Sequence, residues 1–150
     1  MKLTSPVFSE GALIPAQYTC TGGDFSPSLT WSDIPAGAKS LALIADDPDA
    51  PAGTWVHWVA FNLPVTGHGL PEGIKDTKRL PDGGIQGTNS WQRIGYGGPC
   101  PPSGTHRYFF KLYALDTTLS LDSKATAKDV QAAMQGHVLA EAQLMGRFKR

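Results

Sequence analysis

The side chains able to do chemistry in this sequence are a few carboxylates, histidines and one cysteine, and the first group is an acidic turn. Asp47 and Asp49 flank Pro48, which braces the turn and makes it a rigid polar corner. These carboxylates could cap backbone amides, bind a hard cation or orient a histidine. A calcium loop needs more oxygen ligands at defined spacing than this turn supplies, so we predict no metal site.

Two histidines lie on predicted strands. His57 falls in the aromatic and β-branched run 55–63, and on a period of two it shares a face with Trp55, Val59 and Phe61. A histidine on such an apolar face is either a satisfied core residue or a pocket residue.

His106 opens another strand-like run and points to the same side as Tyr108, two residues later. This spacing sets an imidazole beside a phenol. The pair is either a rim histidine with a core tyrosine or part of a binding site.

The most unusual stretch is the loop Gly97–Pro102, which contains Gly98, Cys100 and Pro101. Glycines let backbone amides approach a ligand, so the loop could present N–H groups to an anion. Cys100 could be a nucleophile or a packing residue. We expect Cys20 and Cys100 to be two thiols, with a bridge between them as the alternative.

The elements that must position these groups are mostly strands. Apolar runs at 28–31, 41–45, 55–63 and 107–115 are separated by glycine- and proline-rich turns, which favours an all-β fold. The turn-rich stretch 64–105 is long enough to serve a function. A weak capping box at Thr126 and a 3.6-residue period predict a C-terminal helix over about 127–145, ended by Gly146.

Length and charge limit the remaining classes. The chain has 150 residues, which predicts one domain over 1–150. Lys plus Arg and Asp plus Glu are both 13, so the chain lacks the basic excess of a general nucleic-acid or anionic-membrane binder. No apolar run approaches the ~18 residues of a membrane span. The first residues lack a signal-peptide pattern, which indicates an intracellular chain or a processed one, and of these we expect a cytoplasmic protein.

Taken together, the motifs resemble the phosphatidylethanolamine-binding protein family, and in particular its bacterial and archaeal Raf-kinase-inhibitor-like branch. The resemblance runs along nearly the whole chain. It is carried by Tyr18-Thr19-Cys20 with Leu29-Thr30-Trp31, Asp47-Pro48-Asp49-Ala50-Pro51, Trp55-Val56-His57-Trp58, Gly95–Pro102 with His106-Arg107-Tyr108, and the ending His137–Gly146.

The resemblance implies an antiparallel, Greek-key β-sandwich-like fold with short peripheral helices. It also implies a pocket for a phosphate or phosphoethanolamine-type anion, built from Asp47, Trp55, His57, Gly98, Cys100, Pro101, His106 and Tyr108. Thr21 and the short link from Pro102 to His106 depart from the family pattern, which affects the lip of the pocket and hence the ligand preference. The chain is shorter than eukaryotic members, so their kinase regulation does not transfer automatically.

Within such a pocket, Asp47 beside an imidazole would favour the imidazolium, which would donate to a phosphate oxygen. The leading hypothesis is therefore a small-anion-binding protein that modulates a kinase or protease partner, without a cofactor. One alternative is a hydrolase using His57 or His106 as general base, although binding without turnover fits better. Another is an inhibitor acting through its outer surface. The resemblance and the abundance of Trp and Tyr also suggest a homodimer.

Overall fold

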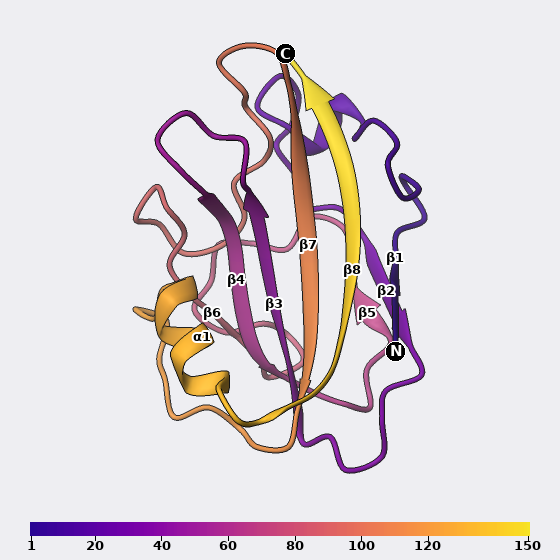
Figure 1. The fold of residues 1–150 in the computed structure, drawn as a ribbon, viewed down its shortest axis with the longest axis vertical. Coiled ribbons are helices and arrows are strands. Elements are labelled where there is room, and N and C mark those ends of the chain that lie inside the picture. Colours follow the sequence, from indigo (N-terminus) through magenta and orange to yellow (C-terminus); the bar gives the residue numbers. More distant parts are fainter.

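The computed structural model describes all residues 1–150, which form two antiparallel β-sheets packed face to face (Figure 1). The larger sheet has the strand order β6-β4-β3-β7-β8, and the smaller has the order β1-β2-β5. The only other regular elements are a 3₁₀ turn, η1, and one α-helix, α1. The bounds are β1 Lys2–Thr4, η1 Ala16–Tyr18, β2 Leu29–Ser32, β3 Ser40–Asp47, β4 Trp55–Leu63, β5 Gly69–Leu70, β6 Ile85–Gln86, β7 Thr105–Leu115, α1 Ala127–Met134 and β8 Val138–Lys149. The mainly β fold class expected from the sequence is confirmed.

The main core fills the space between the two sheets. Strands β1, β2 and β5 contribute Leu3, Trp31 and Leu70, while every second residue of β3 and β7 faces them from the larger sheet. Because side chains alternate along a strand, one face of each strand supplies this core. The main core thereby fixes the two sheets as one body.

The outer face of β3 and β4 is also covered. Val130 and Met134 of α1 pack there against Ile44 and Phe61. All eight residues of β3 are buried, and cover on both faces explains why residues 41–45 form a continuous apolar run rather than an alternating one. The central strand therefore holds its C-terminal residue, Asp47, in a fixed place.

The predicted helix over 127–145 is wrong in its second half. The helix ends at Met134, and residues 138–149 form β8, which pairs with β7 along its whole length. Gly136 has a φ of +83°, a left-handed conformation that suits glycine and turns the chain out of the helix. Gly146, predicted to end the helix, instead pairs with Tyr108 within the sheet. No helix in the structure is both long and apolar enough to span a membrane.

Candidate functional site

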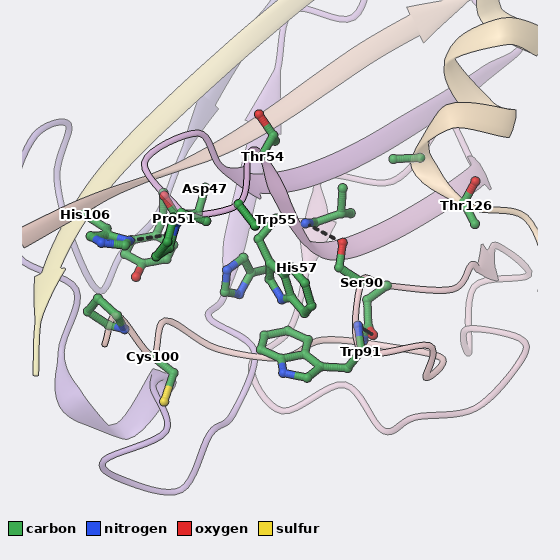
Figure 2. Close-up of a pocket in the computed structure, with 18 of the residues that line it drawn as sticks. Asp47, Pro51, Thr54, Trp55, His57, Ser90, Trp91, Cys100, His106 and Thr126 are labelled. Atoms are coloured by element: carbon green, nitrogen blue, oxygen red, sulfur yellow. Dashed lines mark hydrogen bonds and ion pairs between the residues drawn. The ribbon is translucent and has the colours of Figure 1, made fainter. Parts of the chain in front are cut away.

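A pocket of about 1170 Å³ opens where β3 ends and β4 and β7 begin. Figure 2 shows His106 and Asp47 at one end of it, His57 and Trp91 in the middle, and Thr126 at the other. Seven of the eight residues expected from the sequence line it, the exception being Gly98. The walls consist of residues 50–57, 88–92, 100–102 and 126–128, together with Asp47, His106 and Tyr108.

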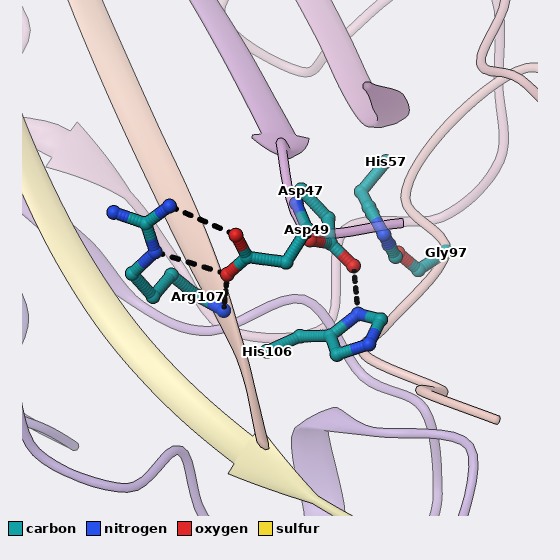
Figure 3. Close-up of polar contacts among 6 residues, drawn as sticks. All are labelled: Asp47, Asp49, His57, Gly97, His106 and Arg107. Carbon is teal, nitrogen blue, oxygen red and sulfur yellow. Dashed lines mark hydrogen bonds and ion pairs between the residues drawn. The ribbon is translucent and has the colours of Figure 1, made fainter. Parts of the chain in front are cut away.

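Asp47 has two roles that the sequence left as alternatives. Its Oδ1 accepts the backbone N–H of Asp49 at 2.7 Å, which closes an Asx turn. Its Oδ2 accepts from Nδ1 of His106 at 2.6 Å, so the same carboxylate orients the imidazole (Figure 3). Both side chains are buried, and Nε2 of His106 has no partner within the protein.

Asp49 fastens the acidic turn to β7. Its carboxylate accepts from the backbone N–H and Nε of Arg107, both at 2.9 Å, and from a terminal guanidinium nitrogen at 2.8 Å (Figure 3). The Arg107 hydrogen bonds hold the pKa of Asp49 at about 2. Since Arg107 follows His106, this clamp fixes the distance between the turn that carries Asp47 and the strand that carries His106.

A β-bulge directs His57 into the pocket. Ala45 pairs with Trp58 whereas Asp46 pairs with Val56, so His57 is an extra residue without a partner in β3. Such bulges re-aim side chains. The expectation that His57 shares one face with Val59 is therefore wrong, because Val59 packs toward α1 and His57 lines the pocket.

His57 is held on its other sides by aromatic rings and a carbonyl. Its ring lies edge-on to Trp91 and Tyr108, at centroid distances of 4.9 and 5.2 Å. Its Nδ1 lies 2.7 Å from the carbonyl oxygen of Gly97. Burial lowers the pKa of His57, and this outweighs the attraction of Asp47. The expected imidazolium is thus not favoured at His57.

Tyr108 lies between the two histidines on the inner side of β7. Its ring stacks near His106 at 6.4 Å, so His106 and Tyr108 share a face, as alternation along a strand requires. The hydroxyl is buried and has no hydrogen-bond partner in the protein. Burial raises the pKa of Tyr108, so the phenol keeps its proton and can donate it to a ligand.

The loop 97–102 offers fewer amides than the sequence suggested. Gly97 donates its N–H to the carbonyl of His57, and Gly98 donates to the Asp24 carboxylate at 2.8 Å. A Cβ on Gly98 would lie 2.3 Å from that carboxylate, so glycine is required there for close packing. The loop's three prolines carry no N–H. The N–H of Cys100 makes no backbone hydrogen bond and lies beside the Tyr108 hydroxyl oxygen, so the loop does not form the amide cradle that we expected.

Cys20 and Cys100 form a disulfide, so the prediction of two thiols is wrong. Two hydrogen bonds near the disulfide join the same two segments of the chain. Cys20 N–H donates to the Pro99 carbonyl, and the Tyr96 hydroxyl donates to the Tyr18 carbonyl. In this form Cys100 has no thiolate and cannot act as a nucleophile. Because the two cysteines are paired, a reducing compartment cannot be assumed for this chain, and the cytoplasmic location stays a prediction.

Sequence reasoning missed the side of the pocket beyond His57. Trp91 stands against both His57 and Trp55, and the Ser90 hydroxyl accepts the N–H of Val56 at 2.8 Å. Both residues belong to the long turn-rich stretch, whose length was the one available signal. Thr126, recognised only as a helix cap, also lines the pocket.

Comparisons with known proteins agree over the whole chain. The phosphatidylethanolamine-binding protein family model matches residues 4–149. A UPF0098 protein of Methanothermobacter thermautotrophicus is 55% identical over 150 residues, covering 100% of this chain and 99% of that protein. A UPF0098 protein of Aquifex aeolicus is 47% identical, with 100% of this chain and 89% of that protein covered.

Solved structures give the same result. A phosphatidylethanolamine-binding protein homologue from Chlamydia trachomatis superposes with a TM-score of 0.92 at 43% identity, covering 99% of this chain and 97% of that chain. E. coli YbcL, described as a member of the mammalian family, gives 0.92 at 35% identity, with 99% and 98% covered. By sequence along its full length and by fold, the chain belongs to the phosphatidylethanolamine-binding protein family.

Proposed function

We propose that this protein binds a small anion carrying a phosphoryl group, of the phosphate or phosphoethanolamine type, in the pocket around His106. The observation that carries the proposal is the buried pair of Asp47 and His106. Because Asp47 takes Nδ1–H, Nε2 of His106 is left for a ligand, beside the unpartnered hydroxyl of Tyr108. Protonated His106 would donate a charge-assisted hydrogen bond to a phosphoryl oxygen.

The size and charge of the pocket support a ligand larger than phosphate itself. A volume of about 1170 Å³ exceeds what one phosphoryl group fills. Trp55 and Trp91 line the section next to His57, and Asp47 is the only carboxylate in the lining. A ligand with a phosphoryl group and a neighbouring cationic or apolar part, such as phosphoethanolamine, would use both sections.

Calorimetric titration at pH 7 with inorganic phosphate and with phosphoethanolamine tests the proposal. His106→Ala should weaken binding by about 1.5–3 kcal/mol, the range for a hydrogen bond to a charged group. His137→Ala is the matched control, because His137 forms a similar pair with Asp116 at 2.7 Å on the surface, outside the pocket. Equal affinity of the wild type and His106→Ala would contradict the proposal.

Binding without turnover fits this site better than hydrolysis. The disulfide occupies the Cys100 sulfur, and the loop beside it presents no pair of free amides to an oxyanion. A screen of phosphoesters would restore the hydrolase hypothesis if the wild type releases phosphate and His106→Ala does not.

Two proposals about partners rest on family membership. The first is that ligand binding modulates a kinase or protease partner, which competition between phosphate and that partner would test. The second is a homodimer. It gains support from β8, an edge strand whose Val138 and Leu139 are 43% and 45% exposed. Light scattering at micromolar concentration measures the mass directly.

A further inference from the structure

We propose that the pocket selects a phosphoryl group that still carries one proton, because the site requires its ligand to donate a hydrogen bond as well as accept them. A phosphomonoester monoanion meets this requirement, whereas sulfate and phosphodiesters do not. The inference rests on the proposed function and adds to it a criterion of ligand class.

The requirement begins with the tautomer of His57. A carbonyl oxygen only accepts hydrogen bonds, so the 2.7 Å contact with Gly97 means that Nδ1 of His57 carries the hydrogen. The return bond, from Gly97 N–H to the His57 carbonyl, fixes the two residues relative to each other. In a neutral ring with Nδ1 protonated, Nε2 carries a lone pair. Nε2 has no partner within the protein, and His57 lines the pocket.

The surroundings of His57 keep it neutral. The residue is 5% exposed and enclosed by the rings of Trp91 and Tyr108. The carboxylates that act on it are Asp47 and Asp46 at the end of β3 and Asp24 in the N-terminal segment. Their attraction is smaller than the effect of burial, which lowers the pKa of His57. The Asp47 carboxylate already accepts hydrogen bonds from His106 and from a backbone amide, and this reduces its stabilisation of a positive charge on His57.

The other polar groups around His57 are hydrogen-bond donors. Together with the acceptor on His57 they match one phosphoryl group that carries a proton. Tyr108 supplies a hydroxyl hydrogen without an acceptor in the protein. The N–H of Cys100 lies beside the Tyr108 oxygen, which leaves the hydroxyl hydrogen to point toward a ligand. Nε2 of His106 donates when the ring is protonated. These donors suit the unprotonated oxygens of a phosphoryl group. The lone pair of His57 Nε2 suits a P–OH and faces an oxygen lone pair unfavourably when no proton is present.

The pocket should therefore distinguish these anions by whether they carry a proton, and not by their shape or size. Sulfate has nearly the size of phosphate but carries no proton near neutral pH, while inorganic phosphate keeps at least one. A phosphodiester, as found in a lipid headgroup, also lacks a proton on its phosphoryl oxygens. An acceptor left unsatisfied in a buried site lowers affinity by roughly tenfold to a hundredfold.

The first experiment titrates the wild type at pH 6, where methyl phosphate keeps its proton in about half of the molecules, with inorganic phosphate, sulfate, methyl phosphate and dimethyl phosphate. Phosphate and methyl phosphate should bind at least about tenfold more tightly than sulfate and dimethyl phosphate. Sulfate within threefold of phosphate would overturn the inference and leave the proposed function standing. If none of the four binds, the inference falls together with the proposed function.

A pH comparison separates the ligand's proton from those of the protein. Methyl phosphate loses its remaining proton near pH 6, so its affinity should fall about a hundredfold from pH 6 to pH 8.5. Inorganic phosphate still carries one proton at pH 8.5, and it meets the same protein groups in the pocket. Its affinity should therefore fall much less. Parallel losses for the two ligands would overturn the inference.

His57→Gln tests the residue itself. A glutamine amide can present N–H to the ligand, so the preference for phosphate over sulfate should shrink to threefold or less. His137→Gln is the matched control, since His137 lies outside the pocket, and it should keep the full preference. A full preference retained in folded His57→Gln would refute the role of His57. If His57→Gln does not fold, the wild-type ligand comparison decides alone.

Discussion

The bridge between Cys20 and Cys100 joins residues separated by 80 positions, and breaking it should lower stability considerably. A cross-link of this span removes conformational entropy from the unfolded chain equivalent to about 4.5 kcal/mol at 25 °C. For a chain of 150 residues this corresponds to a loss of about 14 °C in Tm, with an unfolding entropy of about 2.1 cal/mol/K per residue. Cys20 is exposed, so a reductant can reach the bridge.

The assay is urea unfolding of oxidised protein, of protein reduced with excess dithiothreitol, and of the double variant Cys20→Ser, Cys100→Ser. The reduced protein and the double variant should agree, and only the wild type should respond to the reductant. Both should remain folded, because the bonds from Cys20 N–H to Pro99 and from Gly98 N–H to Asp24 still join the two segments. Unfolding free energies within about 1 kcal/mol of the oxidised protein would refute this reasoning. So would two titratable thiols in denatured, unreduced protein.

Three further outcomes are expected. Thr126→Ala removes the side chain that accepts Asp129 N–H at the start of α1 and should cost about 1 kcal/mol in urea unfolding, whereas an unchanged midpoint would contradict the cap. Gly98→Ala places a Cβ 2.3 Å from the Asp24 carboxylate and should destabilise by about 1–3 kcal/mol, and a neutral result would show that the loop can shift freely. Asp49 has a pKa of about 2 in the folded protein against 3.8 ordinarily, so its stabilisation is present above pH 4 and lost as the pH falls to 2. Asp49→Asn should therefore be less stable than the wild type at pH 6 and equal to it near pH 2, and a constant difference across that range would contradict the Arg107 pairing.

Strands with a clear apolar pattern could be predicted closely. The run 55–63 coincides with β4, and the run 41–45 lies within β3. The segment from residue 138 to 145 was wrongly predicted to be helical because alanine, glutamate, glutamine and leucine favour helices in isolation. Pairing with β7 along the whole of β8 outweighs that local preference. The alternation from Ala140 to Leu144 was a strand signal in the sequence, but a 3.6-residue period could be fitted to the same residues.

The identity of the site residues could be predicted better than their chemistry. Motif resemblance gave seven residues that line the pocket, including Asp47 and His106, which are 59 positions apart. It did not give the bulge that turns His57, because a bulge depends on the register between β3 and β4. The N–H groups of Gly97 and Gly98 are likewise occupied by acceptors distant in sequence, the carbonyl of His57 and the carboxylate of Asp24.

The position of β3 in the middle of the larger sheet has a consequence for synthesis on the ribosome. Its neighbours are β4, which follows directly, and β7, which emerges only after the long turn-rich stretch. Until β7 arrives, one edge of β3, with its apolar run 41–45, has no hydrogen-bonding partner, and exposed edges of this kind pair with other chains. Nascent chains halted before residue 105 should therefore associate with chaperones or with one another, while those extended past β8 should not. The same late step brings His106 to Asp47, so the pocket is completed only when nearly the whole chain has been made.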